Sequence, residues 1–132
     1  MAAGKYSFTI EQGTTVDFEL QYTDANDLPI NLTGYTGRMQ IKSAFANDNP
    51  TTYATLSSTR NADGTGLNFS GSASHGLKPP TSGSIGVYIS AASSSAFTFL
   101  KAKYDLEIAS GSTVVRLLEG SITLSKEVTT NT

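Results

Sequence analysis

Apolar side chains recur at every second position along most of this sequence. Val16, Phe18 and Leu20, for example, alternate with polar and acidic residues. A period of two places alternate side chains on opposite faces of an extended strand, and one apolar face predicts a strand packed on one side. The segments with this character are 6–10, 16–22, 35–42, 53–56, 67–69, 85–89, 104–108 and 114–128. About seven to nine short strands are therefore expected, in a β-sandwich or a small barrel.

Turn-forming residues separate these segments. Residues 24–27 and 61–66 are rich in Asp, Asn and Gly, and 110–112 read Ser-Gly-Ser, which predicts a short hairpin. Residues 70–84 combine Gly, Ser and Pro and are expected to form a loop. Only 91–100 is predicted to be helical, as one short helix that caps an end of the fold.

The length and charge of the chain restrict its organisation and partners. Its 132 residues predict one domain, 1–132. It has no cysteine, which excludes disulfides and thiolate metal sites, and a net charge of −2 without a basic run argues against nucleic acid. No segment has the length and apolar character of a membrane span or a secretory signal. We expect a protein that is made in the cytoplasm and stays soluble until it is assembled.

Catalytic candidates are few. The single histidine, His75, lies in the Ser-Gly-Pro loop without a motif around it, so it is interpreted as an exposed loop residue. Two carboxylate pairs, Asp17 with Glu19 and Asp105 with Glu107, have the spacing that places both members on one side of a strand. Such pairs could cleave glycosides, but outward charges also protect strands from aggregation. We predict no catalytic residues and no enzyme activity.

Metal and cofactor sites are not predicted either. Asp24, Asn26 and Asp27 offer oxygen ligands but lack the spacing of an EF-hand, and local hydrogen bonding in a turn explains them. Asn31 begins a glycosylation sequon that is interpreted as a chance match. Residues 64–66 read Gly-Thr-Gly without the lysine of a phosphate-binding loop. No small-molecule substrate is therefore expected.

The aromatic residues are predicted to lie mostly in the core. Phe97 and Phe99 would mark a protein contact if they were exposed, although core packing is the better interpretation. Exposed tyrosines such as Tyr35, Tyr53 or Tyr88 could stack on sugar rings, which keeps a carbohydrate-binding adhesion module open as an alternative.

Three segments resemble a known family. Residues 28–42 read Leu-Pro-Ile-Asn-Leu-Thr-Gly-Tyr-Thr-Gly-Arg-Met-Gln-Ile-Lys, 104–108 read Tyr-Asp-Leu-Glu-Ile, and 115–124 read Val-Arg-Leu-Leu-Glu-Gly-Ser-Ile-Thr-Leu. Together they resemble the N-terminal domain family of receptor-binding baseplate proteins of bacteriophages. They cover 30 of the 132 residues, in the order in which the family has them.

This resemblance implies an immunoglobulin-like antiparallel β-sandwich and a place in a virion. Leu32 and Gly34 are expected to form the turn. The residues implied as core are Met39, Ile41, Tyr104, Leu106 and Leu117. The implied function is that of a non-enzymatic structural protein, an assembly adaptor in the tail, baseplate, fibre-attachment or neck region. Its partners would be other virion proteins, in a symmetric assembly of many copies. Capsid decoration is the alternative within the virion.

Short flexible tails are the predicted partner contacts, followed by pairing of edge strands. The residues concerned are Met1, Ala2, Ala3, Gly4 and Lys5 at one end, and Glu127, Val128, Thr129, Thr130, Asn131 and Thr132 at the other.

Overall fold

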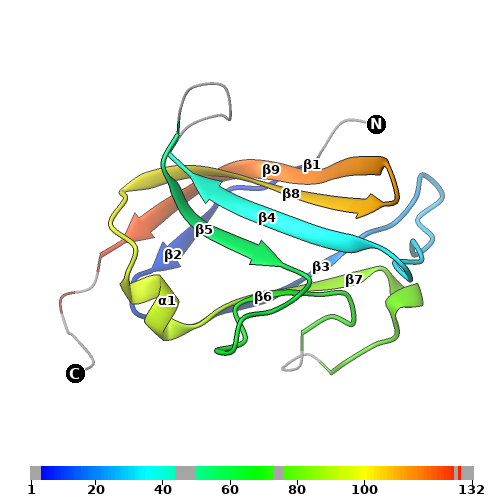
Figure 1. Cartoon of the computed structure of the whole chain (residues 1–132), viewed down its shortest axis with the longest axis horizontal. Helices are drawn as coiled ribbons and strands as arrows, with labels where there is room; N and C mark the ends of the chain where they lie inside the picture. The colour runs from blue at the N-terminus through cyan, green and yellow to red at the C-terminus, as the bar shows by residue number, and fades with distance from the viewer. Residues whose placement is uncertain (1–3, 44–49, 73–75, 127, 129–132) are drawn as a thin grey trace.

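The protein is a sandwich of two β-sheets (Figure 1). The computed structural model describes residues 4–43, 50–72, 76–126 and 128. Its elements in chain order are β1 (Gly4–Lys5), β2 (Phe8–Glu11), β3 (Val16–Gln21), β4 (Thr36–Lys42), β5 (Thr52–Ser57), β6 (Gly66–Asn68), the 3-10 helix η3 (Pro80–Ser82), β7 (Ser84–Ile89), α1 (Ala91–Ser95), β8 (Lys101–Ser110) and β9 (Thr113–Ser125). The predicted all-β sandwich is confirmed.

The strand order is that of an immunoglobulin-like fold. The larger sheet runs β1-β9-β8-β4-β5, with β2 also paired to β9, and the smaller sheet runs β3-β7-β6. These correspond to the G-F-C-C′ and B-E-D strand orders of immunoglobulin variable domains. The connections 22–35 and 110–113 and the described residues 69–72 and 76–83 gather at one end of the molecule, and α1 lies at the other (Figure 1).

The N-terminal strands depart from the expected antiparallel arrangement. Both β1 and β2 run parallel to β9, with Gly4 opposite Leu118 and Phe8 opposite Ile122. Pairings within the smaller sheet and between β4, β5, β8 and β9 are antiparallel. The sequence did not reveal the parallel edge because a period of two is the same for both directions of pairing.

Alternation predicted the buried faces well. Leu32, Met39, Ile41 and Leu106 are at most 1% exposed. Leu117 is the exception, because it is only partly buried at the margin of the core. Leu106 pairs with Leu118 and the next residue of β8 pairs with Arg116, so Leu117 is the extra residue of a β-bulge. β9 is one strand that ends at Ser125, whereas the alternating segment was predicted to continue to residue 128.

The predicted helix is shorter than expected. It ends at Ser95, whereas 91–100 was predicted. Phe97 and Phe99 are both 5% exposed, and their rings pack against each other with centroids 5.3 Å apart. Two buried side chains at positions i and i+2 require an extended chain rather than a helix. The prediction that this pair belongs to the core is confirmed.

An aromatic cluster fills the flank of the sandwich beneath β1 and β2. The ring of Phe8 lies edge-on to Phe18 of β3 and to Tyr104 of β8, at centroid distances of 5.3 and 5.4 Å. The Tyr104 hydroxyl donates a hydrogen bond to the Tyr6 carbonyl. Burial, and to a lesser degree the neighbouring Tyr6, raise the pKa of Tyr104, so its hydroxyl remains a donor at neutral pH.

Gly120 makes this contact possible. It lies opposite Tyr104 in the β8–β9 register. A Cβ atom at Gly120 would lie 2.0 Å from the Tyr6 carbonyl oxygen, and the flanking Ser121 N–H donates to the Ser7 hydroxyl at 3.1 Å. The chain between β1 and β2 can therefore lie this close to β9 only because β9 has no side chain at this position.

Substitution of Gly120 tests this packing. We expect Gly120→Ala to lower the free energy of unfolding by about 1–3 kcal/mol, because the added methyl group displaces the Tyr6 backbone. Gly4→Ala on the same edge is the control: its Cβ would meet Leu117 and Leu118 at an ordinary 3.5 Å, and a change within about 0.5 kcal/mol is expected. Urea unfolding followed by circular dichroism measures both. Equal stability of the two variants would contradict the close approach at Gly120.

Candidate functional site

Residues 69–72, which follow β6 and are called the strap below, cover part of the outer face of the smaller sheet. It passes over Gly86 of β7, where a Cβ atom would lie only 2.5 Å from the Gly71 carbonyl oxygen. Such an approach between backbones is possible only because Gly86 has no side chain. The strap turns β7 from an open surface into the floor of a recess.

The carboxylates of β3 hold the strap in place. Asp17 accepts the Ser72 hydroxyl at 2.6 Å, and Glu19 accepts the Ser72 backbone N–H at 3.2 Å. Both Glu19 oxygens are 3.0 Å from Lys78 Nζ, and the Glu19 side chain is only 18% exposed. The predicted pair Asp17 and Glu19 does point away from the core, but it fixes a loop instead of lying free in solvent.

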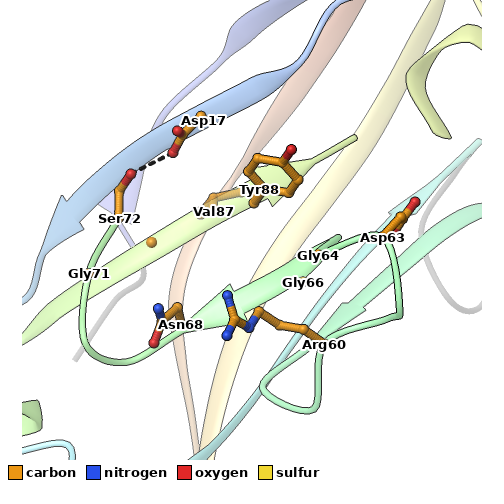
Figure 2. Close-up of a pocket in the computed structure, with 11 residues that line it drawn as sticks. Asp17, Arg60, Asp63, Gly64, Gly66, Asn68, Gly71, Ser72, Val87 and Tyr88 are labelled. Atoms are coloured by element: carbon orange, nitrogen blue, oxygen red, sulfur yellow. Dashed lines mark hydrogen bonds between the residues drawn. The ribbon is translucent and has the colours of Figure 1, made fainter. Parts of the chain in front are cut away.

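A pocket of about 210 Å³ opens between this strap and the turn before β6 (Figure 2). Its polar lining includes Asp17, Arg60, Asp63 and Asn68, and Tyr88 forms an aromatic wall. Glycines make up much of the remaining surface: Gly64, Gly66, Gly71 and Gly86. The pocket is thus a place where backbone is exposed and a few side chains project over it.

Two of these glycines position the side chains above them. A Cβ on Gly66 would lie 2.7 Å from Cγ of Arg60, so the stem of Arg60 crosses β6 there. Figure 2 shows its guanidinium extending toward Asn68. A Cβ on Gly64 would lie 3.2 Å from the ring of Tyr88. Larger residues at either position would displace the arginine or the tyrosine.

Asp63 joins the pocket to the start of α1. Its carboxylate accepts the hydroxyls of Ser90 at 2.6 Å and Ser93 at 3.0 Å, and the backbone N–H of Thr65 at 3.0 Å. These hydrogen bonds, that from Ser90 foremost, lower the pKa of Asp63 from 3.8 to about 2. Asp63 is therefore a fixed anion at neutral pH.

The second carboxylate pair lies on the other sheet. Asp105 and Glu107 project from the outer face of β8 and are 3.5 and 3.7 Å from the Arg116 guanidinium. Glu119 extends this network to Lys5 at 3.0 Å, and the hydrogen bond from Lys5 lowers the pKa of Glu119. The two predicted pairs are thus on different sheets and do not form one catalytic site. The Arg116 network explains Asp105 and Glu107 as surface ion pairs.

The edge strand β5 is an exposed polar surface of the larger sheet. Ser58 N–H donates to the Gly37 carbonyl at 3.0 Å. Because hydrogen-bonded and non-hydrogen-bonded pairs alternate in an antiparallel ladder, the backbone groups of Thr55 point away from β4. Ser57, two residues on, directs its carbonyl to Gly66, which agrees with this alternation. β5 contains no charged residue and no proline.

A groove continues from this edge toward the hairpin end. Its volume is about 500 Å³, and it crosses the outer face from residues 57–59 to Val114. Three large apolar side chains are exposed in or beside the connections at this end: Leu28 at 58%, Leu77 at 63% and Val114 at 60%. Exposed apolar groups that gather at one end are typical of an interaction surface.

The other oxygen-rich candidates are explained by turns. Asp24 Oδ1 accepts the N–H groups of Asn26 and Leu28, at 2.8 and 3.0 Å, and Asp27 has a φ of 63°. Asn31 likewise accepts the Thr33 N–H at 3.0 Å. In the part of the chain that the structure describes, no three His, Cys, Asp or Glu side chains gather to form a metal site.

The three tyrosines considered for sugar stacking do not share one sheet face. Tyr53 packs on Phe99 with centroids 4.7 Å apart, and Tyr35 follows the turn before β4. Tyr88 alone lines the pocket. The sequence did not predict this pocket, because nothing in the alternation of β7 indicates which outward residues a distant strap leaves open. The glycines at 64, 66, 71 and 86 were the available signal.

The predicted tail contacts lie largely outside the described residues. This holds for Met1, Ala2, Ala3, Glu127, Thr129, Thr130, Asn131 and Thr132, and also for His75. Gly4 and Lys5 form β1 and belong to the larger sheet. Val128 is 99% exposed.

Comparison with known proteins does not identify a relative. The sequence matches no protein-family model, and a search of curated proteins finds no match. The resemblance to phage baseplate proteins therefore stays a prediction. Within the described residues, no helix has the length and apolar character needed to cross a membrane.

The hydrogen bonds to Asp63 predict a measurable titration. We expect Ser90→Ala to raise the pKa of Asp63 from about 2 toward 3.8, since Ser90 is the main cause of its depression. Side-chain carboxyl resonances followed by NMR against pH would show this. The control is Ser95→Ala, because the Ser95 hydroxyl donates to the Ala92 carbonyl instead.

The lowered pKa of Asp63 also makes the stability of the folded protein depend on pH. A carboxyl whose pKa is lower in the folded state stabilises that state above about pH 4, and this contribution is lost as the pH falls through about 2. The difference in urea midpoint between the unaltered protein and Asp63→Asn should shrink across that window. A difference that stays constant from pH 7 to pH 2 would contradict it.

Proposed function

We propose that this protein is a non-enzymatic structural module that joins other proteins in an assembly, and that the assembly is a bacteriophage particle. The observation that carries the assembly function is the difference between the two edges of the larger sheet. One edge is formed by the short strands β1 and β2, which carry the charged residues Lys5 and Glu11. The opposite edge strand, β5, is uncharged, and no strand among the described residues pairs with its outer side.

An open edge strand of this kind favours strand addition. Proteins ordinarily protect their sheet edges with charges, prolines or covering loops. β5 reads Thr-Tyr-Ala-Thr-Leu-Ser and has no charge or proline. The outward N–H and C=O of Thr55 are placed to pair with an extended segment of a partner. Main-chain hydrogen bonds of this type tolerate many partner sequences, which suits an adaptor.

The groove at the end of β5 supports a larger contact. A stable interface buries about 800 Å² on each partner, which is more than one short strand supplies. The groove from residues 57–59 to Val114 continues the edge toward the hairpin end. Arg38 and Thr36 line it together with Ala109, so its surface combines charged, polar and small residues. A partner that pairs with β5 can extend into this groove.

The phage setting depends on the resemblance of residues 28–42 and 104–124. The core roles that it implies agree with the structure at Met39, Ile41 and Leu106, which are buried. We place the protein in the tail, baseplate, fibre-attachment or neck region, in several copies. Capsid decoration is the second position considered.

A proline in β5 tests strand addition. We expect Thr55→Pro to fold with a Tm lowered by only a few degrees, because the N–H that it removes does not pair with β4. It should nevertheless abolish incorporation into particles assembled in cells that carry the variant gene. Thr55→Val is the matched control: it also loses the hydrogen bond between Thr55 Oγ1 and Gln40 at 3.3 Å but keeps the backbone N–H. Equal amounts of both variants in purified particles, measured by mass spectrometry, would rule out pairing at β5.

Cross-linking of purified particles tests the position. Links from Lys5, Lys101 or Lys126 to tail, baseplate or fibre proteins are expected for an adaptor. Links to the major capsid protein would instead make it a decoration protein. Absence from particles would refute the virion role.

A further inference from the structure

We propose that the pocket on the smaller sheet binds one neutral sugar ring of a glycan, held by Arg60, Asn68 and Tyr88. This site is separate in chemistry from the β5 edge, and it gives the protein a ligand as well as assembly partners. The inference depends on three properties of the pocket: its unused hydrogen-bond donors, its charge and its shape.

The pocket offers several donors with no partner among the residues that the structure describes. Arg60 makes no hydrogen bond or ion pair there, and a guanidinium has five N–H groups in a fixed plane. Asn68 uses its Oδ1 atom to accept the Ser70 N–H at 3.0 Å, which leaves its amide NH₂ available. The Tyr88 hydroxyl lies on the same surface. A matching ligand must therefore present several acceptor oxygens.

The carboxylates select against an anionic ligand. Asp17 and Asp63 line the same pocket as Arg60, which is the only cationic residue among the described ones that line it. Asp63 is ionised at neutral pH since its pKa is about 2. A sulfate, phosphate or sugar carboxylate would be attracted by one cationic side chain and repelled by two anionic ones. Hydroxyl groups can accept hydrogen bonds from Arg60 and donate hydrogen bonds to the carboxylates, so they suit all the polar side chains of the pocket.

The shape fits a single ring. A volume of about 210 Å³ is smaller than the roughly 300–1,000 Å³ of pockets for drug-sized molecules. Tyr88 is half-buried and supported by Gly64, so its ring is a rigid wall on which the apolar face of a sugar can lie. Glycines elsewhere in the lining let ligand oxygens approach the backbone closely.

The site is built for binding rather than cleavage. Glycoside hydrolysis needs a carboxylic acid that is protonated near neutral pH, with a raised pKa. Asp63 has the opposite shift, because Ser90, Thr65 and Ser93 donate to it. It can accept a hydrogen bond from a sugar but cannot supply a proton to a leaving group.

The test is an NMR titration of the whole chain with methyl glycosides of glucose, galactose, mannose and N-acetylglucosamine, each up to about 50 mM. At least one of them should shift the backbone amides of residues 64–68 and 86–88, with millimolar affinity. Glucuronic acid and inorganic sulfate should bind more weakly at the same residues.

Variants assign the shifts to the pocket. Arg60→Met removes the guanidinium and keeps the stem, and should weaken binding about tenfold. Tyr88→Leu should weaken it roughly three- to tenfold. Asn68→Asp retains the acceptor for Ser70 N–H but loses the donors, and should also bind more weakly. Arg38→Met, an exposed arginine of β4, is the control and should bind like the unaltered protein.

Several results would overturn the site. They are the absence of shifts with every neutral glycoside, equal binding by Arg60→Met and Arg38→Met, and preferential binding of the anions. Release of reducing sugar from a polysaccharide would contradict binding without cleavage. Thermal melts of each variant show whether it is folded. The Thr55→Pro variant should retain sugar binding, so failure of the assembly proposal and failure of this one are distinguishable.

Discussion

The close approach of the Tyr6 backbone to Gly120 is the contact on which the rest of the fold depends most. It allows β1 and β2 to lie on the same strand, β9, one after the other. Phe8 is thereby placed between Phe18 and Tyr104, where it closes one flank of the core. The edge that β1 and β2 form carries the charged residues Lys5 and Glu11, whereas the opposite edge strand, β5, carries no charge.

The pocket depends on glycine in the same way. At Gly86 the missing side chain admits the strap, and Asp17 and Glu19 then hold the strap by hydrogen bonds. An outer sheet face normally presents alternate side chains to water. Here the strap converts part of that face into a recess that is lined by the Asp17 carboxylate and the Arg60 guanidinium. The candidate site is created by the close contact between two backbone segments more than by any side-chain motif.

The sequence was sufficient for the features that burial dictates and insufficient for those that depend on distant contacts. Met39, Ile41 and Leu106 were predicted as core because alternation reports which face is apolar. The end of α1 could have been found, since Phe97 and Phe99 are spaced for an extended chain. The position of the strap could not have been predicted, because Glu19 and Lys78 are 59 residues apart and loops between strands follow no periodicity. Parallel pairing of β1 and β2 was equally hidden.

The two proposed surfaces share one segment of chain. Residues 58–65 lead from β5 in the larger sheet to β6 in the smaller one, and they carry both Arg60 and Asp63. The Ser57 carbonyl, at the end of the open edge, lies against Gly66, over which the Arg60 stem passes. A strand paired at Thr55 would therefore end beside the turn that positions the guanidinium. Assembly and ligand binding would then meet at this turn, the only direct covalent passage from β5 to the smaller sheet.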